Sequence, residues 1–326
     1  MNDIKIGIIG TNFVSDWLCE AVAVSDGIVN HAVYSRTAEK GGEFAAKHGI
    51  NIVYTDMDEF LSSDIDAVYI AAPNKLHFEY AKSAMEKGKH VLLEKPATLD
   101  VTEFDELCAV ADKNNVVLLE AMRPVHDPSI EVIRENLCKI GVIRRAVFEF
   151  CQYSSRYDKF KNGEIMNAFN PQLGNAAIMD IGVYAIETCV ALFGRPEGIY
   201  ARSVKFENGM EGMGTAFLDY VDFHAEIVYS KITDSVNPSV ITGEDGSLVI
   251  GKLSTMENGK LIIRKGETTE LFSGAIAEGG FNMIYEVKDF VNAINGSLDC
   301  GKYHEWTRMT LEVMDEIREQ NGIKFI

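Results

Sequence analysis

The sequence lacks the features that mark membrane and nucleic-acid-binding proteins. No apolar run approaches the roughly 20 residues that span a bilayer, and the first residues enter a strand without a signal-like segment. No Lys- or Arg-rich block interrupts a chain of formal net charge -18, which disfavours nucleic acid and anionic membrane surfaces as partners. We therefore expect a cytoplasmic protein without a nucleic-acid or membrane partner.

The spacing of a metal site or a disulfide framework is also lacking. The six cysteines form no Cys-x-x-Cys pair, and most lie in apolar patterns typical of buried thiols in a reducing compartment. Five of the seven histidines lie outside the motifs described below and form no ligand cluster: His31, His48, His90, His224 and His304. No Gly-x-Ser-x-Gly elbow supports a hydrolase. We expect no disulfide and no bound metal.

The first third of the chain alternates short apolar strands with helical stretches. Strands are predicted at 4–9, 28–34, 52–54, 67–71, 90–94 and 116–121, and helices at 13–24, 38–48, 57–61, 75–87 and 101–114. Parallel neighbours need crossover helices, so this rhythm predicts an α/β domain over residues 1–121 with a doubly wound parallel sheet.

After Arg123-Pro124 the pattern changes to that of an α+β domain over residues 122–326. A helix at 128–139 leads into a segment at 143–154, and strands follow at 198–206, 213–220, 223–229, 239–242, 247–250 and 260–264. Asn-Gly and Asp-Gly turns between these strands favour hairpins and a largely antiparallel open sheet. Two amphipathic helices, 282–295 and 305–321, close the chain and can pack back on the first domain.

The turn between the first strand and the first helix is typical of a dinucleotide-binding loop. Backbone N–H groups at such a helix N-terminus can face a pyrophosphate. Asn12, which tolerates positive φ, replaces the second glycine of Gly-x-Gly-x-x-Gly, and the small Ser15 replaces the third. A plain strand-to-helix turn is the alternative. The residues expected against the cofactor are Gly7, Gly10, Thr11, Asn12 and Phe13.

The end of the second strand indicates which dinucleotide is bound. NAD sites usually place an acid there for the ribose hydroxyl, whereas this chain has Ser35, Arg36 and Thr37. A guanidinium with adjacent hydroxyls suits a 2′-phosphate, so NADP is favoured and NAD is the alternative. Without a cofactor, Arg36 would simply belong to the first turn of a solvated helix.

Four segments together resemble the glucose-fructose oxidoreductase / inositol dehydrogenase / MocA (Gfo/Idh/MocA) family. They are residues 7–15, Ala72-Pro73-Asn74-x-x-His77, the run 88–96 that ends in Glu94-Lys95-Pro96, and Asp180-Ile181-Gly182-Val183-Tyr184. The resemblance spans almost the whole chain. It implies a Rossmann domain and an NAD(P)-dependent oxidoreductase that acts on a sugar, polyol or cyclic diol, with a homodimer or homotetramer as the assembly.

The resemblance also implies a proton donor. In that family the lysine of Glu-Lys-Pro lies beside the nicotinamide and works as, or with, the proton donor to the substrate oxygen, and Lys95 holds this position. Desolvation at a dry strand end would lower the pKa of its amine toward the working range of a general acid/base. The alternative is a solvated strand end. Glu94 is expected to orient the site beside the cofactor.

Asp180 and Tyr184 are four residues apart and share one face of a helix. In the family an aspartate, with a His or Tyr one turn later, completes the site with the lysine. The tyrosine resembles the dihydrodiol dehydrogenase branch. As alternatives, Asp180 caps a helix at 181–193, a role compatible with the first, and Tyr184 is a half-buried aromatic with an exposed hydroxyl.

Two further segments have less definite roles. The family packs a loop near the nicotinamide ribose, which here is the segment Ala72, Pro73, Asn74 and His77, although His77 could instead cap or pack its helix. Arg123 and His126, past the sixth strand, can reach cofactor or substrate.

The stretch at 174–177 departs from the family. Asn175 and Ala176 stand where relatives often have glycines near the substrate pocket. This change puts the substrate size and the activity in question. It keeps open a second function, that of an NADP-binding sensor or co-repressor-like protein without turnover.

Overall fold

The computed structural model describes residues 3–274 and 282–325. The chain divides into two compact units. The first comprises Met1–Arg123 and Ile276–Glu305, and the second comprises Pro124–Ala275 and Trp306–Ile326. The last part of the chain is therefore divided between the two units, and the division falls between Glu305 and Trp306.

The first unit contains a six-stranded sheet in which every pair of neighbours is parallel. Its order is β3-β2-β1-β4-β5-β6. The strands are β1 (Ile4–Ile9), β2 (Ile28–Tyr34), β3 (Ile52–Tyr54), β4 (Ala67–Ile70), β5 (His90–Glu94) and β6 (Leu118–Ala121). The predicted doubly wound sheet is confirmed. The strand order reverses between β1 and β4, where open α/β sheets bind ligands at the carboxyl ends of their strands.

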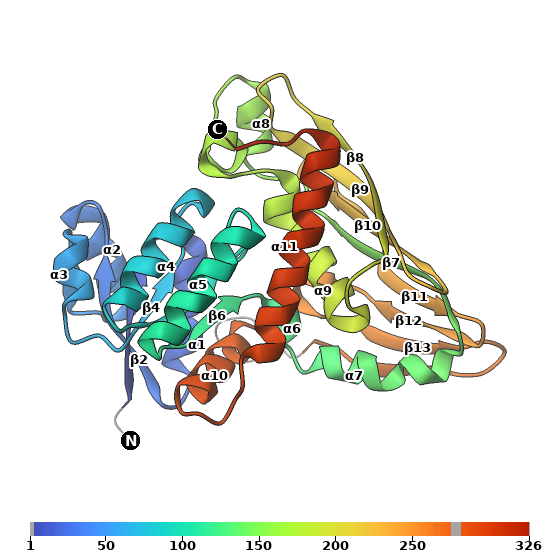
Figure 1. Cartoon of the computed structure of the whole chain (residues 1–326), viewed down its shortest axis with the longest axis horizontal. Helices are drawn as coiled ribbons and strands as arrows, with labels where there is room; N and C mark the ends of the chain where they lie inside the picture. Colours follow the sequence, from blue (N-terminus) through green and yellow to red (C-terminus); the bar gives the residue numbers. More distant parts are fainter. Residues whose placement is uncertain (1–2, 275–281, 326) are drawn as a thin grey trace. The chain divides into compact units, whose positions relative to one another are not determined.

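Helices cover this sheet and bury its strands on both faces, which explains their continuous apolar runs. They are α1 (Phe13–Ala23), α2 (Ala38–His48), α3 (Met57–Leu61), the 3₁₀ turn Asn74–Leu76, α4 (His77–Glu86), α5 (Val101–Asn114) and α10 (Met283–Ile294). Helices α4 and α5 pack together, and α1 packs with α10 (Figure 1). Helix α10 therefore belongs to this unit although it lies far along the chain.

The second unit contains an eight-stranded sheet of order β14-β13-β12-β11-β7-β10-β9-β8. Its strands are β7 (Ile143–Cys151), β8 (Gly198–Lys205), β9 (Glu211–Asp219), β10 (His224–Ser230), β11 (Ser239–Gly243), β12 (Gly246–Ile250), β13 (Gly259–Ile263) and β14 (Thr268–Phe272). All neighbours are antiparallel except β7 and β10. The expectation of a largely antiparallel sheet is confirmed.

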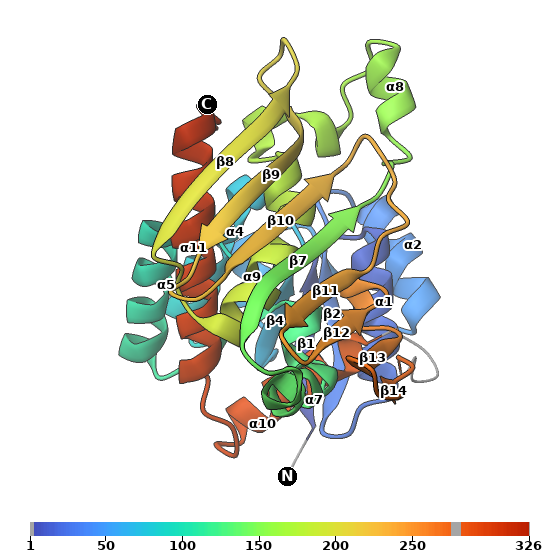
Figure 2. The ribbon, with the colours of Figure 1, turned by 90° about the vertical axis from the view of Figure 1, so that its right-hand side faces the viewer.

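The helical segments of the second unit lie mainly on one side of this sheet. They are α6 (Arg123–His126), α7 (Ser129–Asn136), α8 (Tyr157–Lys161), α9 (Val183–Phe193), α11 (Gly301–Asn321), the π-helix Ile178–Gly182 and four 3₁₀ turns, Leu137–Ile140, Asn167–Phe169, Pro171–Leu173 and Leu253–Thr255. Helices α6 and α11 begin in the first unit, which includes Arg123 and the residues of α11 up to Glu305. Helix α9 is buried from Val183 to Ala191 and packs against β7 and β10. Figure 2 shows the opposite face of β7 to β10 toward the viewer.

Two features of the second sheet differ from the sequence prediction. Strand β14 was not predicted, because Thr268–Phe272 is polar and mostly exposed and shows no apolar alternation. The parallel pairing of β7 with β10 was also not foreseen. A long connection, rather than a hairpin, separates these two strands in the sequence, so no turn motif fixes their direction.

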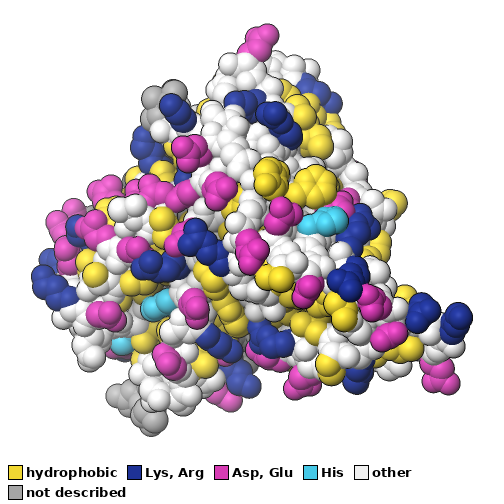
Figure 3. All heavy atoms as spheres, turned by 45° about the vertical axis from the view of Figure 1, so that its right-hand side comes forward, with side chains coloured by type: hydrophobic (Ala, Val, Ile, Leu, Met, Phe, Trp, Pro, Cys, Tyr) yellow, Lys and Arg dark blue, Asp and Glu magenta, His cyan; other side chains and the backbone are white. Residues whose placement is uncertain are grey.

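The cysteines and the surface charges are dispersed. All six cysteines are free; Cys19 and Cys189 are buried, whereas Cys138 is exposed, unlike the buried thiols expected. Acidic and basic side chains are interspersed on the face drawn in Figure 3, so the acidity is not gathered into one patch on that face. No described helix is both long and apolar enough to cross a membrane.

Candidate active site

The turn from β1 to α1 brings the backbone close to the end of β4. Gly10 has φ +107°, and a Cβ atom at this position would lie 2.5 Å from the carbonyl oxygen of Ala71. The amide N–H of Ala71 donates to the carbonyl of Ile9 at 2.9 Å. Gly7 is enclosed as well, because a Cβ there would meet the ring of Phe60 at 2.5 Å. The two glycines therefore allow a close approach that other residues would block.

Asn12 serves the turn in a different way from the one predicted. Its φ of -100° is ordinary extended backbone, so positive φ does not explain the residue. Its side-chain oxygen accepts from the N–H groups of Val14 and Ser15, and its amide donates to the carbonyl of Ala71 at 2.9 Å. Asn12 is the N-cap of α1 and ties the turn to β4. Ser15 is fully buried, as close helix packing requires.

Part of this turn is exposed. Asn12 and Phe13 are exposed, and Phe13 exposes 47% of its surface although it is aromatic. The N–H groups of Val14 and Ser15 are engaged by Asn12, so the backbone from Thr11 to Phe13 is the part of the turn that can face a pyrophosphate.

The loop after β2 carries the candidate phosphate-binding residues. Ser35 is buried, and its backbone N–H donates to the carbonyl of Tyr54, whereas Arg36 is exposed. Thr37 is the N-cap of α2 and accepts from Lys40 N–H. Burial raises the pKa of Tyr80 on α4, while the nearby charge of Arg36 lowers it. Arg36 therefore lies outside α2, exposed, and its charge acts on Tyr80 of α4.

His77 joins two loops at the carboxyl edge of the sheet. It begins α4, is 1% exposed, and lies with Nδ1 2.9 Å from the Pro96 oxygen and Nε2 3.0 Å from the Ala72 oxygen. Burial lowers its pKa, although the two carbonyl groups oppose this effect. The structure thus gives His77 the packing role that the sequence left open, and Pro73 and Asn74 lie in the loop that it anchors.

The segment that carries Lys95 is held by several backbone contacts. The bond from Lys95 to Pro96 is cis. Lys95 N–H donates to Glu94 Oε2 at 3.2 Å, and Ala97 N–H donates to the buried carboxylate of Glu120 at 2.6 Å. The Lys95 side chain is half-buried at the end of β5. The fold therefore fixes the backbone that carries the candidate proton donor.

Glu94 belongs to a buried charged cluster. Tyr69 donates its hydroxyl to Glu94 Oε1 at 2.5 Å. Burial raises the pKa of Glu94, while the nearby charges of Lys95 and Arg123 lower it. Glu286 on α10 is fully buried, and neither of its carboxyl oxygens has a hydrogen-bond partner among the described residues. Burial, and then the charge of Glu94, raise the pKa of Glu286 well above its ordinary value.

Arg123 lies just beyond β6 and is part of the same charged cluster. Its guanidinium is 5.8 Å from the ring centroid of Trp17, and its charge lowers the pKa of both Glu94 and Glu286. Arg123 is half-buried, and its positive charge acts on both of these buried carboxyl groups. His126 is buried.

In the second unit, Asp180 lies within the π-helix Ile178–Gly182, and this helix is held from two sides. Lys231 lies 2.7 Å from Asp180 Oδ2. Glu211, which is fully buried, accepts from the N–H of Ile178 at 2.8 Å. Burial raises the pKa of Glu211, whereas its hydrogen-bond donors lower it. π-Helical turns often occur at functional sites.

The position of Asp180 corrects the capping alternative. It lies inside the π-helix rather than before a helix at 181–193, and the N-cap of α9 is Gly182, without a side-chain cap. Tyr184, in the first turn of α9, is only 7% exposed, and its ring meets that of Phe150 edge to face at 5.4 Å. Tyr184 is therefore more buried than the half-buried aromatic considered from the sequence.

The altered glycine stretch lies next to the π-helix in the sequence. Gly174 keeps a positive φ of +76°, while Ala176 and Ala177 are fully buried. The Asn175 amide donates to the carbonyl of Asn167 at 2.8 Å, and so ties this loop to its neighbour. The side chains that replace glycine thus pack within the second unit.

The candidate residues fall in both units. The cofactor-binding candidates, together with Lys95, lie in the first, whereas Asp180 and Tyr184 lie in the second. Sequence reasoning missed Glu286, Lys231 and Glu211. The only available signal was a charged residue within or beside an apolar run, and this signal is weak because most such residues are exposed.

Comparison with known proteins gives the following matches. A family model described as "Oxidoreductase family, NAD-binding Rossmann fold" matches residues 4–122. A second model, described as "GFO/IDH/MocA C-terminal domain", matches residues 137–249. Together the two matches cover most of the chain, with all six strands of the first sheet and part of the second sheet.

Individual relatives match over nearly the whole length. The scyllo-inositol 2-dehydrogenase (NADP(+)) IolU of Bacillus subtilis (strain 168) is 41% identical over 325 residues, which are 99% of this chain and 98% of that protein. The trans-1,2-dihydrobenzene-1,2-diol dehydrogenase of Xenopus laevis is 28% identical over 338 residues, 98% of this chain and 99% of that one.

A solved structure shows the same fold. It is that of KijD10, a 3-ketoreductase from Actinomadura kijaniata in complex with TDP-benzene and NADP. Its TM-score is 0.84, with 22% sequence identity over 98% of each chain.

Proposed function

Because this chain belongs to the Gfo/Idh/MocA family of oxidoreductases, we propose that it passes hydride between NADP and a hydroxyl- or carbonyl-bearing carbon of a cyclic polyol. It is an NAD(P)-dependent dehydrogenase or reductase that acts on CH–OH groups, as the resemblance implied. The observation that most supports the proposal is the carboxyl edge of the first sheet, where the Gly10 turn, Arg36 and Lys95 follow β1, β2 and β5.

The residues of the first unit fit NADP. The backbone from Thr11 to Phe13 would hold the pyrophosphate, and Arg36 with Ser35 and Thr37 would bind the 2′-phosphate. When bound, NADP accepts or supplies the hydride at C4 of its nicotinamide. Ala72 to Asn74, anchored by His77, would line the nicotinamide ribose.

The proton would be exchanged by Lys95. Hydride transfer to or from a carbon that bears oxygen requires a proton to leave or reach that oxygen, and a positioned amine can perform this step. The hydrogen bonds donated by the N–H groups of Lys95 and Ala97 fix the main chain around the lysine. In this proposal Asp180 and Tyr184 hold the substrate oxygen while Lys95 exchanges the proton.

We propose scyllo-inositol as the first substrate to test, because the Bacillus subtilis relative is named for this compound. The purified chain should reduce NADP⁺ with scyllo-inositol faster than with linear polyols or aldoses of equal concentration. Turnover of cyclic diols alone would place the chain nearer to the dihydrodiol dehydrogenases. NADPH binding without turnover of any sugar, polyol or diol would contradict the enzyme proposal and support the sensor.

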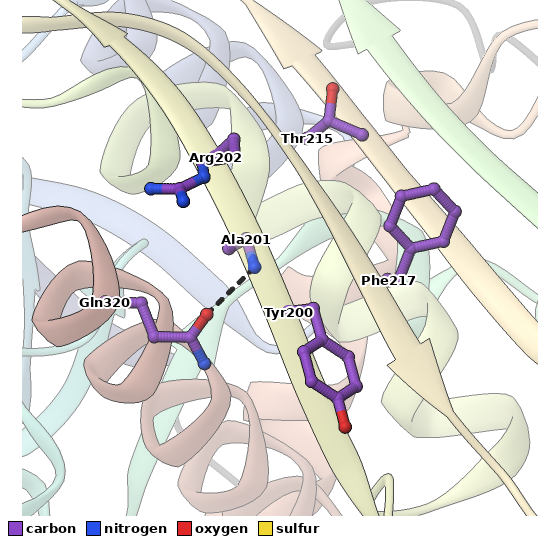
Figure 4. Close-up of a pocket in the computed structure, with 6 residues that line it drawn as sticks. All are labelled: Tyr200, Ala201, Arg202, Thr215, Phe217 and Gln320. Atoms are coloured by element: carbon purple, nitrogen blue, oxygen red, sulfur yellow. Dashed lines mark hydrogen bonds between the residues drawn. The ribbon is translucent and has the colours of Figure 1, made fainter.

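A second copy of the chain is the proposed partner. Tyr200 and Phe217 are cross-strand partners on β8 and β9 and expose 65% and 43% of their surface. They line a pocket together with Arg202, Thr215 and Gln320, and Figure 4 shows the rings of Tyr200 and Phe217 on neighbouring strands. Exposed aromatic side chains of this kind favour association.

The backbone of β8 is already covered at the edge of the sheet. Gln320 on α11 accepts from Ala201 N–H at 2.9 Å and donates to the Ile199 carbonyl at 2.7 Å. We therefore propose that the second copy packs face to face on the sheet, and does not extend it at β8. A two-fold axis would place the same aromatic pair on both sides of the interface.

A further inference from the structure

We propose that Lys231 is a positioning residue that keeps Asp180 an ionised carboxylate, so that Asp180 accepts a hydrogen bond from a hydroxyl of the substrate. This inference rests on the proposed function, in which Asp180 contacts the substrate. It adds a residue that neither the sequence motifs nor the family resemblance identifies.

The Lys231 amine is buried, and three contacts hold it in position. Nζ lies 2.7 Å from Asp180 Oδ2, donates to the carbonyl of Ala168 at 2.7 Å, and lies 5.1 Å from the ring centroid of Phe169. The Lys231 side chain is 2% exposed, whereas the Asp180 side chain is 40% exposed. The amine is thus shielded from solvent, and the carboxylate between it and solvent can still meet a ligand.

The backbone around Lys231 is equally fixed. Its N–H donates to the carbonyl of Gly212 and its carbonyl accepts from Ser154, both at 2.9 Å. The preceding Ser230 hydroxyl accepts from the N–H groups of Ile232 and Thr233. The lysine therefore leaves the end of β10 at a defined point beside the π-helix.

Phe169 is held by other aromatic rings. It is fully buried and stacks with Tyr157 at 5.6 Å and with Phe160 at 5.0 Å between ring centroids. A cation over an aromatic face is attracted by the ring quadrupole. The ring and the Ala168 carbonyl thus provide a site for an ammonium group in a region with little water.

The chemistry follows from the charge balance. An ammonium group that is removed from water is costly unless it is paired, so the Lys231 site favours the charged form of Asp180. An ionised carboxylate can only accept hydrogen bonds. Asp180 therefore binds a hydroxyl beside the reacting oxygen, which can donate in both oxidation states of the substrate, and leaves the proton exchange at the reacting oxygen to Lys95.

The first test reads the charge of Asp180 directly and needs no turnover. The carboxyl ¹³C resonance of Asp180, identified by its loss in Asp180→Asn, is followed against pH in the parent chain and in Lys231→Met. Since an adjacent cation lowers a carboxyl pKa by about 1 to 3 units and Asp180 is partly exposed, we expect its pKa to rise by about 1 unit in Lys231→Met. An unchanged pKa would overturn the inference.

Two further variants guard against misfolding. Lys231→Gln keeps a donor without the charge and should give the same rise, whereas Lys231→Arg keeps the charge and should restore the parent value. Lys159→Met, which removes an exposed lysine of the same unit, serves as the matched control and should leave the Asp180 titration unchanged.

The second test links the pair to the reaction. Activity that needs ionised Asp180 is lost as pH falls through its pKa, so the acid limb of kcat/KM should move up by about 1 pH unit in Lys231→Met and return in Lys231→Arg. In the Asp180→Asn background, Lys231→Met should change kcat/KM by less than about twofold. A full independent loss in that background would show that Lys231 acts elsewhere.

The two tests separate the failure of this inference from that of the proposed function. If Asp180→Asn leaves kcat/KM unchanged, or the parent turns over no polyol, the proposed role of Asp180 is wrong, whatever the resonance shows. If Asp180→Asn impairs turnover but Lys231→Met moves neither the resonance nor the acid limb, only the Lys231 inference is wrong.

Discussion

At the scale of single residues, we propose that cofactor choice depends on Arg36. Its guanidinium is exposed at the end of β2, where an acid would be expected for NAD. Arg36→Asp should weaken NADPH binding by at least about tenfold, because a charge-assisted contact is lost and a repulsion is added. NADH binding should change little. Fluorescence of the bound dihydronicotinamide measures both.

A matched variant makes the Arg36 result specific. Lys87→Asp introduces the same change of charge at the C-terminal end of α4, which lies at the opposite edge of the sheet. It should leave both affinities unchanged. Equal loss of NADPH and NADH binding in Arg36→Asp would show that the residue does not read the 2′-phosphate.

The buried carboxyl of Glu286 should make stability depend on pH. Its pKa in the folded chain is raised, chiefly by burial, above the ordinary value of 4.5. The contribution of Glu286 to stability is therefore greatest below pH 4.5, and it falls as the pH rises toward the folded pKa. Glu286→Gln removes this loss. The melting temperature of the variant minus that of the parent should therefore be higher at pH 8 than at pH 5, by at least about 2 °C.

The control for Glu286 is an exposed carboxyl of the same unit. Glu43→Gln on α2 should shift the melting temperature equally, and only slightly, at both pH values. A difference between Glu286→Gln and the parent that is the same at pH 5 and pH 8 would contradict an uncharged Glu286.

At the scale of elements, the turn from β1 to α1 depends on Gly10. Gly10→Ala should destabilise the chain and weaken NADPH binding, because it combines positive φ with a Cβ placed 2.5 Å from the Ala71 oxygen. Gly88→Ala is the matched variant, since Gly88 has φ +74° and a Cβ atom there would meet nothing within 4 Å. It should cost only about 1 to 2 kcal/mol from the dihedral angle and leave binding intact.

Some elements of the fold were predictable from the sequence, and others were not. The parallel sheet was predictable because its strands are buried on both faces and alternate with helices, as at β4 and α4. The π-helix was not, because one extra residue in a helical turn leaves the apolar pattern almost unchanged. The Asn12 cap was identified as important for the wrong reason, since its sequence position allows both positive φ and capping.

The candidate site was predictable in one part only. Motif residues such as Gly10, Arg36 and Lys95 follow strands, and the parallel sheet itself brings their strand ends to one edge. The charged neighbours of the candidate residues are distant in sequence. The charge of Glu94 acts on Glu286, which lies on α10, and Lys231, which follows β10, forms an ion pair with Asp180. Only the tertiary fold brings such residues together, so a local sequence pattern cannot predict these pairs.

At the scale of the whole molecule, the open sheet face predicts self-association. Replacing Tyr200 and Phe217 together with Glu should place like charges opposite each other in a face-to-face dimer and dissociate it. Val236→Glu, at a position that is 99% exposed, should leave the assembly unchanged. Sedimentation velocity distinguishes the species, and a parent that sediments as a 36.1 kDa monomer at micromolar concentration would contradict the proposed interface.

The central claim is that Lys95 exchanges the proton in an NADP-dependent reaction, and one paired measurement tests it most directly. NADPH affinity and kcat with scyllo-inositol are determined for the parent, Lys95→Met and Lys95→Arg. Loss of general acid/base catalysis should lower kcat by about 10²- to 10⁴-fold in both variants, while NADPH binding stays near that of the parent. Retention of kcat in Lys95→Arg, which keeps the charge but cannot release a proton, would contradict the account.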